Sequence, residues 1–183
     1  TSLFNQNYTG YKIVLVLSLE DFPSKEIPWT LQLLRLKGLE IFWCNENYKS
    51  YTKLIPVRTK YSNSTIITFD DDVIYEKWRI SKLISEHNIY PESIIGHRGR
   101  EIKINENKEV ESYLYWKLCY KRLNSKYTFL TGVGGVLYPP NKVFDTLIKD
   151  YSLANQLCPN ADDVFFWAIA YYLDLNIICL GNE

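Results

Sequence analysis

The chain has 183 residues, enough for one domain with a core, and 46% of them are hydrophobic, which excludes an intrinsically disordered protein. Lys plus Arg and Asp plus Glu total 21 each, so the formal net charge is zero and no basic stripe points to nucleic acid. No apolar run reaches the roughly 18 residues of a membrane-spanning helix. We expect residues 1–183 to form a single domain.

Apolar runs of strand length alternate with amphipathic helices in the first half of the chain. Residues 12–19 (KIVLVLSL) are continuously apolar, which is typical of a strand buried on both faces. The further elements predicted here are a helix at 29–37 that ends at Gly38, a strand at Leu39–Cys44, a short helix or turn at 51–60, a strand at 65–69 and a helix that ends near residue 88.

The second half mixes strands and helices in a less regular order. Its predicted elements are a strand at 93–97, a hairpin over 102–113, a bulged strand or strand pair at 127–138, helices at 143–153 and 164–173, and a strand at 175–180. We therefore expect an α/β fold with a mostly parallel central sheet flanked by helices, and with mixed strands in the second half.

Three adjacent acids, Asp70, Asp71 and Asp72, follow the strand predicted at 65–69. If the strand continued, Asp70 and Asp72 would share a face, and carboxylates about 4 Å apart repel by roughly 4 kcal/mol at an effective dielectric of about 20. A divalent cation with oxygen ligands would remove that cost. The alternative is that an Asp caps the following helix, although three acids exceed what a cap needs.

A second acid pair, Asp162 and Asp163, opens the apolar helix predicted at 164–173. The ordinary explanation is that Asn160 caps this helix and that both acids interact with its dipole in the first turn. A buried carboxylate near other acids also has a raised pKa and can serve as a general base. The residues alone leave both interpretations open.

The cationic and glycine-rich segments give weaker evidence of a functional site. The glycines within 132–135 lack the spacing of a phosphate loop, but they permit a bulge or the close approach of a ligand. Lys53 lies shortly before the strand at 65–69 and is either a solvated surface group or part of a site. Residues 97–100 (HRGR) either meet a phosphate or form a surface loop.

Five segments resemble, in the same order, nucleotide-sugar glycosyltransferases of the GT-A fold, in particular bacterial enzymes that build cell-surface glycans. These segments are SYTKLIP, ITFDDDVIY, IIGHRGREI, FLTGVGGVLYPP and LCPNADDVFFWAIA, within about residues 11–180. The resemblance implies a GT-A-like (Rossmann-like) domain. It also implies metal-dependent transfer of a sugar, with inversion, from a nucleotide-diphosphate donor to a glycan or glycolipid acceptor in polysaccharide or lipooligosaccharide synthesis.

The resemblance further implies roles for individual residues. Asp70 and Asp72 are expected to hold Mn²⁺ or Mg²⁺ on the donor diphosphate, and Asp71 to contact the ribose or the donor sugar. Asp163, or else Asp162, matches the acid that acts as catalytic base in inverting members. The donor-side positions are Lys53, Asp70, Asp71, Gly134 and Gly135.

Members of this family begin with a strand and a turn that contact the nucleotide base. This sequence opens within the helix that follows them, so we expect the first strand to be absent. The resemblance implies a cytoplasmic location, with peripheral association at the inner face of the cell membrane as a further expectation. Two other functions stay open: a Mg²⁺-dependent phosphohydrolase whose nucleophile is Asp70, and a non-catalytic glycan- or nucleotide-binding module.

Overall fold

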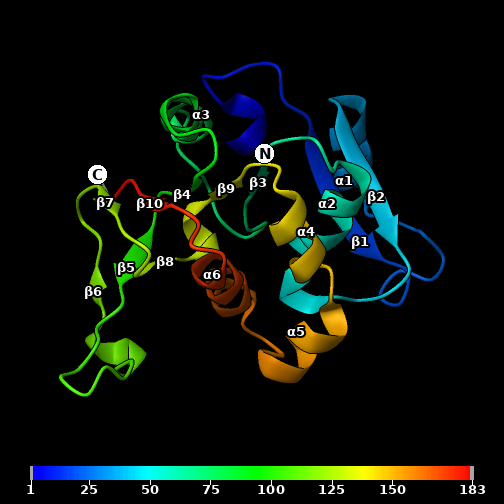
Figure 1. The fold of residues 1–183 in the computed structure, drawn as a ribbon. Coiled ribbons are helices and arrows are strands. Elements are labelled where there is room, and N and C mark those ends of the chain that lie inside the picture. The colour runs from blue at the N-terminus through cyan, green and yellow to red at the C-terminus, as the bar shows by residue number, and fades with distance from the viewer. Residues whose placement is uncertain (1, 182–183) are drawn as a thin grey trace.

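The computed structural model describes residues 2–181 and has a mixed α/β fold with several small sheets (Figure 1). Its α-helices are α1 Trp29–Leu36, α2 Ile55–Lys60, α3 Arg79–Ile89, α4 Lys142–Ile148, α5 Tyr151–Leu157 and α6 Asp162–Tyr172. Its strands are β1 Ile13–Ser18, β2 Leu39–Cys44, β3 Ile66–Thr68, β4 Ile94–Gly96, β5 Gly99–Glu101, β6 Lys117–Leu118, β7 Leu123–Asn124, β8 Thr128–Leu130, β9 Val136–Tyr138 and β10 Ile177–Cys179. None of these helices is long and apolar enough to cross a membrane.

The central sheet has five strands in the order β3-β9-β4-β10-β7. Only β10 and β4 pair in parallel. The other three pairs are antiparallel, namely β3–β9, β4–β9 and β10–β7. The expectation of a mostly parallel central sheet is therefore wrong. β9 follows a short 3₁₀ turn, η4 (Gly132–Gly134), and no crossover helix leads into it, so it runs against both of its neighbours.

The remaining strands form two smaller sheets. β1 and β2 pair in parallel from Ile13 opposite Leu39 to Ser18 opposite Cys44, with α1 as the crossover helix between them. This confirms the predicted strands at 12–19 and Leu39–Cys44. The other sheet is antiparallel, in the order β6-β5-β8.

The core lies on both faces of the five-stranded sheet. On one face, buried residues such as Ile94, Val136 and Ile177 belong to the cluster that includes residues of α4 and α6. Their chain neighbours, such as Ile95 and Ile178, belong to the cluster of α3 on the opposite face. This alternation follows from the two-residue period of a strand, and Figure 1 shows α3 on one side of the sheet with α4 and α6 on the other.

The single helix predicted at 143–153 is two helices, α4 and α5. The Asp150 side chain accepts a hydrogen bond from the Leu153 backbone N–H, which starts α5 with a new N-cap. Asn141 caps α4 in the same way, through the backbone N–H groups of Val143 and Phe144. The prediction of one helix is wrong because side chains at caps compete with the helix interior for these backbone groups.

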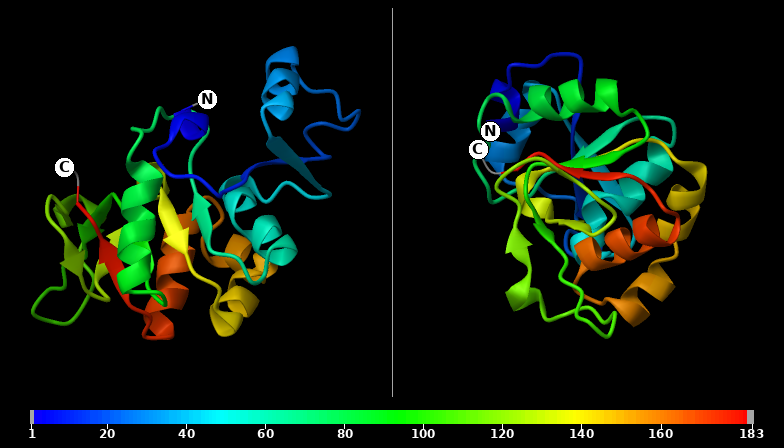
Figure 2. Two further views of the ribbon diagram at one scale, coloured as in Figure 1. Left: turned by 90° about the horizontal axis from the view of Figure 1, so that it is seen from above. Right: turned by 60° about the vertical axis from the view of Figure 1, so that its left-hand side comes forward.

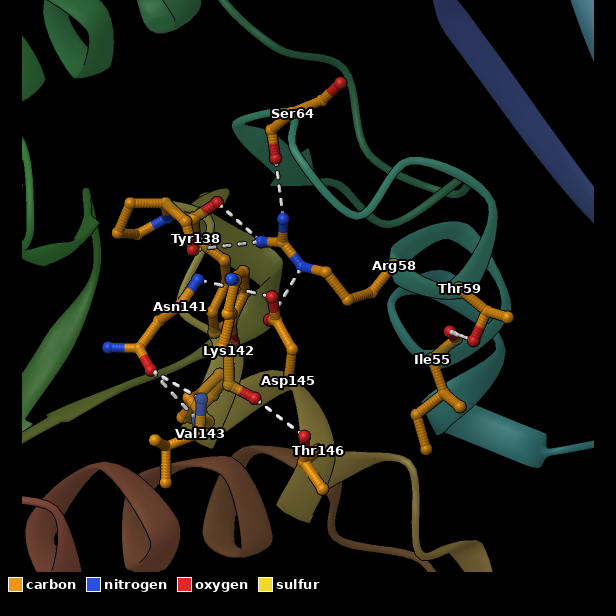
Figure 3. Close-up of polar contacts among 12 residues, drawn as sticks. Ile55, Arg58, Thr59, Ser64, Tyr138, Asn141, Lys142, Val143, Asp145 and Thr146 are labelled. Carbon is orange, nitrogen blue, oxygen red and sulfur yellow. Dashed lines mark hydrogen bonds and ion pairs between the residues drawn. The ribbon is translucent and has the colours of Figure 1, made fainter.

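A buried ion pair fastens α2 to the segment around β9 and α4 (Figure 3). The Arg58 side chain is fully buried, and its Nε lies 2.9 Å from Oδ1 of Asp145. Its terminal nitrogens donate to the backbone carbonyls of Ser64 at 2.6 Å and of Tyr138 at 2.8 Å. Because α2 directly follows Lys53, this ion pair also holds the backbone from which the Lys53 side chain reaches the candidate site.

Candidate functional site

The three adjacent acids lie in a turn and not in a strand. β3 ends at Thr68, and Asp71 and Asp72 form a turn after it. The alternation of faces expected for a continuing strand therefore does not apply to Asp70 and Asp72. The helix α3 begins only at Arg79, with Trp78 at its N-cap, so the acids do not cap it. This removes the helix-cap explanation for the acids.

Lys53 joins the first group of acids to the second. It is the last residue of a 3₁₀ turn, η2 (Lys49–Lys53), and its Nζ lies 3.1 Å from Oδ1 of Asp70 and 3.1 Å from Oδ2 of Asp162. The side chain of Asp162 is only 8% exposed, whereas that of Asp70 is 30% exposed. The ammonium group thus bridges an accessible carboxylate and a buried one that lie far apart in the sequence.

Asp163 is held by the backbone of the glycine-rich segment. The Gly132 N–H donates a hydrogen bond of 2.9 Å to Oδ2 of Asp163, in the first turn of α6. A Cβ atom added to Gly132 would lie 2.6 Å from Nζ of Lys53 and 3.2 Å from Oδ1 of Asp163. Glycine at this position therefore lets Lys53 and Asp163 lie close to the same backbone. Asn160 is not the N-cap of α6; that position is Ala161, which makes no side-chain capping bond.

The charges around this cluster shift two pKa values. Burial, followed by the neighbouring charge of Asp162, raises the pKa of Asp163 to about 6, against the opposing effects of the Gly132 N–H and Lys53. Asp163 also borders a small cavity of about 20 Å³ together with apolar residues such as Phe166 and Leu130. Burial acts to lower the pKa of Lys53, but the charges of Asp162, Asp163 and Asp70 together raise it above its ordinary value.

Tyr75 is a site residue that the sequence analysis did not identify. Its hydroxyl accepts a hydrogen bond from the Asp70 backbone N–H at 3.0 Å and donates one to the Val133 carbonyl at 3.2 Å. Its ring packs against Phe69 with centroids 4.6 Å apart. Tyr75 therefore ties the acidic turn to the glycine-rich segment. Only its position in a polar loop, where a buried aromatic residue is unusual, could have pointed to it.

The other predicted donor-side residues are placed less closely around Lys53. Asp71 and Asp72 are both exposed, and Asp71 lines a large groove that also reaches Lys53 and Asp70. A Cβ on Gly134 would lie 2.7 Å from the backbone N of Arg98, and one on Gly135 (φ +85°) would lie 2.4 Å from the Phe69 ring. These two glycines thus serve close packing within the protein. That these glycines also border a donor sugar stays a prediction.

The side chains of His97, Arg98 and Arg100 make contacts within the protein. His97 is fully buried, its Nε2 lies 2.8 Å from the carbonyl oxygen of Arg79, and burial lowers its pKa to about 4. Arg98 donates to the Thr131 hydroxyl, and Arg100 donates to the Trp116 carbonyl. The HRGR segment is therefore a structural connection between β4 and β5.

The site does not contain a complete set of metal ligands. Within residues 2–181, no group of three or more His, Cys, Asp or Glu side chains is arranged to hold a metal ion. Asp70 and Asp162 are paired with Lys53, whose Nζ lies 3.1 Å from an oxygen of each. Mg²⁺ and similar ions are commonly held by one or two carboxylates together with substrate phosphates, which fits the partly exposed Asp70 and the exposed Asp72.

Neither a protein-family model nor a curated protein sequence matches this chain.

Replacing Lys53 with Met should destabilise the protein at pH 7.5. The substitution leaves the buried Asp162 without its cation, and breaking a buried pair costs about 2–4 kcal/mol when one partner keeps some exposure. Chemical denaturation at pH 7.5 and pH 5 measures the loss, which should shrink at pH 5 as Asp163 becomes protonated. Lys49→Met, at an exposed lysine of the same turn, is the matched control. Equal losses in the two variants would contradict a specific role for Lys53.

Proposed function

We propose that the protein is a metal-dependent glycosyltransferase of the GT-A type, acting on a nucleotide-diphosphate sugar and a glycan or glycolipid acceptor. The observation that carries the proposal is the convergence of Asp70, Lys53 and the Asp162–Asp163 pair, which come from three separate parts of the chain. In this cluster one acid is accessible, another is buried and paired, and a third has a raised pKa. A transferase needs acids in these different states.

Asp163 is the proposed general base. A carboxylate with a pKa of about 6 is largely ionised at neutral pH and is still basic enough to accept a proton from an acceptor hydroxyl as that hydroxyl attacks the sugar. The Gly132 N–H holds one oxygen of Asp163 in place, and this leaves the other oxygen to take the proton. Lys53 stabilises the ionised form of the acid pair during this step.

Asp70 and Asp72 are the residues that would hold Mn²⁺ or Mg²⁺, and the bound ion would supply electrostatic stabilisation of the departing diphosphate. Asp70 keeps its orientation through two contacts, the Lys53 ion pair and the bond from its backbone N–H to Tyr75. Asp71 lines the groove, and in this proposal it would contact the ribose or the sugar of a donor. The expectations about the cell membrane and about cell-surface glycan synthesis belong to this proposal.

Replacing Asp72 with Asn should weaken the Mn²⁺-dependent binding of nucleoside diphosphates by about 100-fold, or about 2.7 kcal/mol, because a charged ligand is lost. Asp72 is exposed, so the melting temperature without ligand should stay unchanged. Calorimetric titration of a panel of nucleoside diphosphates, with and without Mn²⁺, measures the effect. Asp174→Asn, at an acid that is 84% exposed, is the control. Equal affinities for Asp72→Asn and the unmodified protein would refute the metal assignment.

The Lys53–Asp70 ion pair favours a second candidate, a Mg²⁺-dependent phosphohydrolase. In that reaction Asp70 would attack a phosphoryl group and displace its leaving group, and water would then hydrolyse the aspartyl phosphate, while Lys53 would hold the Asp70 carboxylate in position. Ile74 stands where such a nucleophile motif usually carries Thr or Val, which speaks against this candidate. Trapping a phosphate analogue such as beryllium fluoride on Asp70 would favour the hydrolase, whereas release of a sugar from nucleotide sugars would favour the transferase.

A further inference from the structure

A small cavity lies between α6 and the strands, beside the candidate site. The right view of Figure 2 shows α6 below the strands, on the side opposite α3. The cavity has a volume of about 20 Å³. Its apolar lining comes from three strands and from α6, namely Ile94, Leu130, Ile177, Phe166, Trp167 and Ala170. A buried water molecule needs a space of about 10–15 Å³, so this cavity has room for a single water.

Three polar side chains also line this cavity, those of Thr128 in β8, Tyr138 in β9 and Asp163 in α6. They come from separate parts of the chain, and the apolar residues around them offer no hydrogen bonds. An apolar cavity of this size stays dry, whereas a cavity that presents two to four polar groups holds a water molecule. The polar groups therefore decide what the cavity contains.

The Thr128 hydroxyl is buried without a partner. Thr128 is fully buried, and within residues 2–181 its Oγ1 makes no hydrogen bond. Thr68, another buried strand residue, differs because its hydroxyl donates to the Val136 carbonyl at 3.4 Å. A buried hydroxyl without a hydrogen bond destabilises a protein, and Val would suit the same strand position without that cost. The Thr128 hydroxyl therefore indicates a partner inside the cavity.

Asp163 and Tyr138 can supply the other hydrogen bonds. The Asp163 carboxylate accepts a bond from the Gly132 N–H, and its two oxygens have about four acceptor positions. Burial, followed by the charges of Asp163 and Asp162, raises the pKa of Tyr138 well above its ordinary value. The Tyr138 hydroxyl therefore keeps its proton and can donate it in a hydrogen bond. The cavity thus combines two hydroxyl groups with one carboxylate.

We infer that this cavity is the binding site of one internal water molecule, which accepts hydrogen bonds from Thr128 and Tyr138 and donates one to the Asp163 carboxylate. Three hydrogen bonds are the usual number for a buried water. Thr128 and Tyr138 are then positioning residues, since they act on Asp163 through the water. The water site does not depend on the proposed function, whereas its importance for a general base rests on that function.

The water would hold Asp163 from a second side. The Gly132 N–H is one donor to this carboxylate, and the water is another, so its rotation is more restricted. A hydrogen bond donated to a carboxylate also favours its ionised form. The charged groups around Asp163, namely Lys53, Asp162 and Asp70, are not among the described residues that line the cavity. The water therefore acts on Asp163 separately from the ion pairs of Lys53.

Replacing Thr128 with Val tests the inference, because a hydrated cavity and a dry one predict opposite results. In a hydrated cavity, Val removes a partner of the water, and the Asp163 carboxylate loses a donor. Its titration midpoint, followed by carbon-13 NMR of the carboxyl group, should rise by about one pH unit, and Tm at pH 7.5 should fall by about 3 °C. In a dry cavity, Val removes an unpaired hydroxyl, so Tm should rise and the midpoint should not change.

Three further variants separate the hydroxyl groups from packing. Thr128→Ser keeps the hydroxyl and should keep the midpoint of Asp163. Tyr138→Phe keeps the ring, which packs against Phe144 and Phe166, and it should also raise the midpoint. Thr128→Val combined with Tyr138→Phe should raise the midpoint by less than the sum of the single effects, because both act through one water. Fully additive effects would overturn a shared water.

A crystal structure of the unmodified chain is the direct measurement. We expect an ordered water at about 2.6–3.2 Å from Oγ1 of Thr128, from the Tyr138 hydroxyl and from an oxygen of Asp163. A cavity without electron density, or a Thr128→Val variant with a higher Tm and an unchanged Asp163 midpoint, would overturn the inference.

These measurements need no substrate, so they are independent of the proposed function. A raised midpoint in Thr128→Val, in a chain that transfers no sugar, would support the water site and refute the transferase. Sugar transfer by the unmodified chain, together with an unchanged midpoint in Thr128→Val, would refute the water site alone.

Discussion

Replacing Asp163 with Asn should make the protein more stable at neutral pH while greatly lowering the proposed transferase activity. The pKa of this carboxyl is raised from 3.8 to about 6 in the folded chain, so the unfolded state ionises first as the pH rises. Asp163 therefore lowers the free energy of unfolding progressively between pH 3.8 and 6, by about 3 kcal/mol once both states are ionised. Asn removes this penalty, and its side-chain oxygen can still accept the Gly132 N–H bond.

Urea denaturation at pH 4.5 and pH 7.5 measures this gain. The stabilisation by Asp163→Asn should be small at pH 4.5 and near its full value at pH 7.5, because the penalty appears only as Asp163 is forced to ionise. Asp174→Asn, at a highly exposed acid, should change stability little at either pH. A gain that is equal at both pH values would show that the raised pKa of Asp163 is not its cause.

The same substitution should lower the rate of the proposed sugar transfer by about 10²–10⁴-fold, the usual contribution of a general base. In the unmodified protein, the rate should rise with pH through a midpoint near 6, as Asp163 loses its proton. A variant that is more stable and yet inactive cannot owe its inactivity to unfolding. Full activity in Asp163→Asn would exclude this residue as the base.

Replacing Arg58 with Met should cause the largest loss of stability among the substitutions considered, about 3–5 kcal/mol. The change leaves Asp145 as a buried carboxylate without its cation, and it removes the donors to the Ser64 and Tyr138 carbonyls. Burial already raises the pKa of Asp145 in the presence of Arg58, so the loss should be greatest at neutral pH, where the isolated carboxylate would have to ionise. Chemical denaturation at pH 7.5 measures it.

Two comparisons separate this ion pair from surface charge effects. Lys60→Met breaks a surface pair with Glu40, in which the two side chains are 42% and 29% exposed, and it should change stability far less than Arg58→Met does. The double variant Arg58→Met with Asp145→Leu should recover part of the loss, because no buried charge then remains unpaired. A loss of under 1 kcal/mol in the single variant would show that the pair does not fasten α2.

The fold was predictable wherever a local pattern decides the structure. The apolar run at 12–19 forms β1, and the β-branched residues after Ser64 form β3. Both were predictable because strand propensity and period are local properties. The insertion of β9 between β3 and β4 was not predictable, since a three-residue strand carries no mark of its partners. A cap at Asp150 similarly divides a continuous helical pattern into α4 and α5.

The candidate site was predictable in its residues but not in its connections. The acids at 70–72 and 162–163 stand out in the sequence because core packing gives no reason for them. Nothing in the sequence indicates that Lys53 lies between Asp70 and Asp162, because the contact depends on how η2 packs against α6. The bond from Gly132 to Asp163 is equally hidden, since its donor is a backbone N–H that every residue except proline possesses.

Sugar release from a panel of nucleotide-diphosphate sugars, measured across pH 5–8 with and without Mn²⁺, tests the proposed transferase most directly. We predict release that requires the metal, rises with pH through a midpoint near 6, and is lost in both Asp163→Asn and Asp72→Asn. Release that is independent of metal, or equal in Asp163→Asn and the unmodified protein, would contradict the account, as would no release at all.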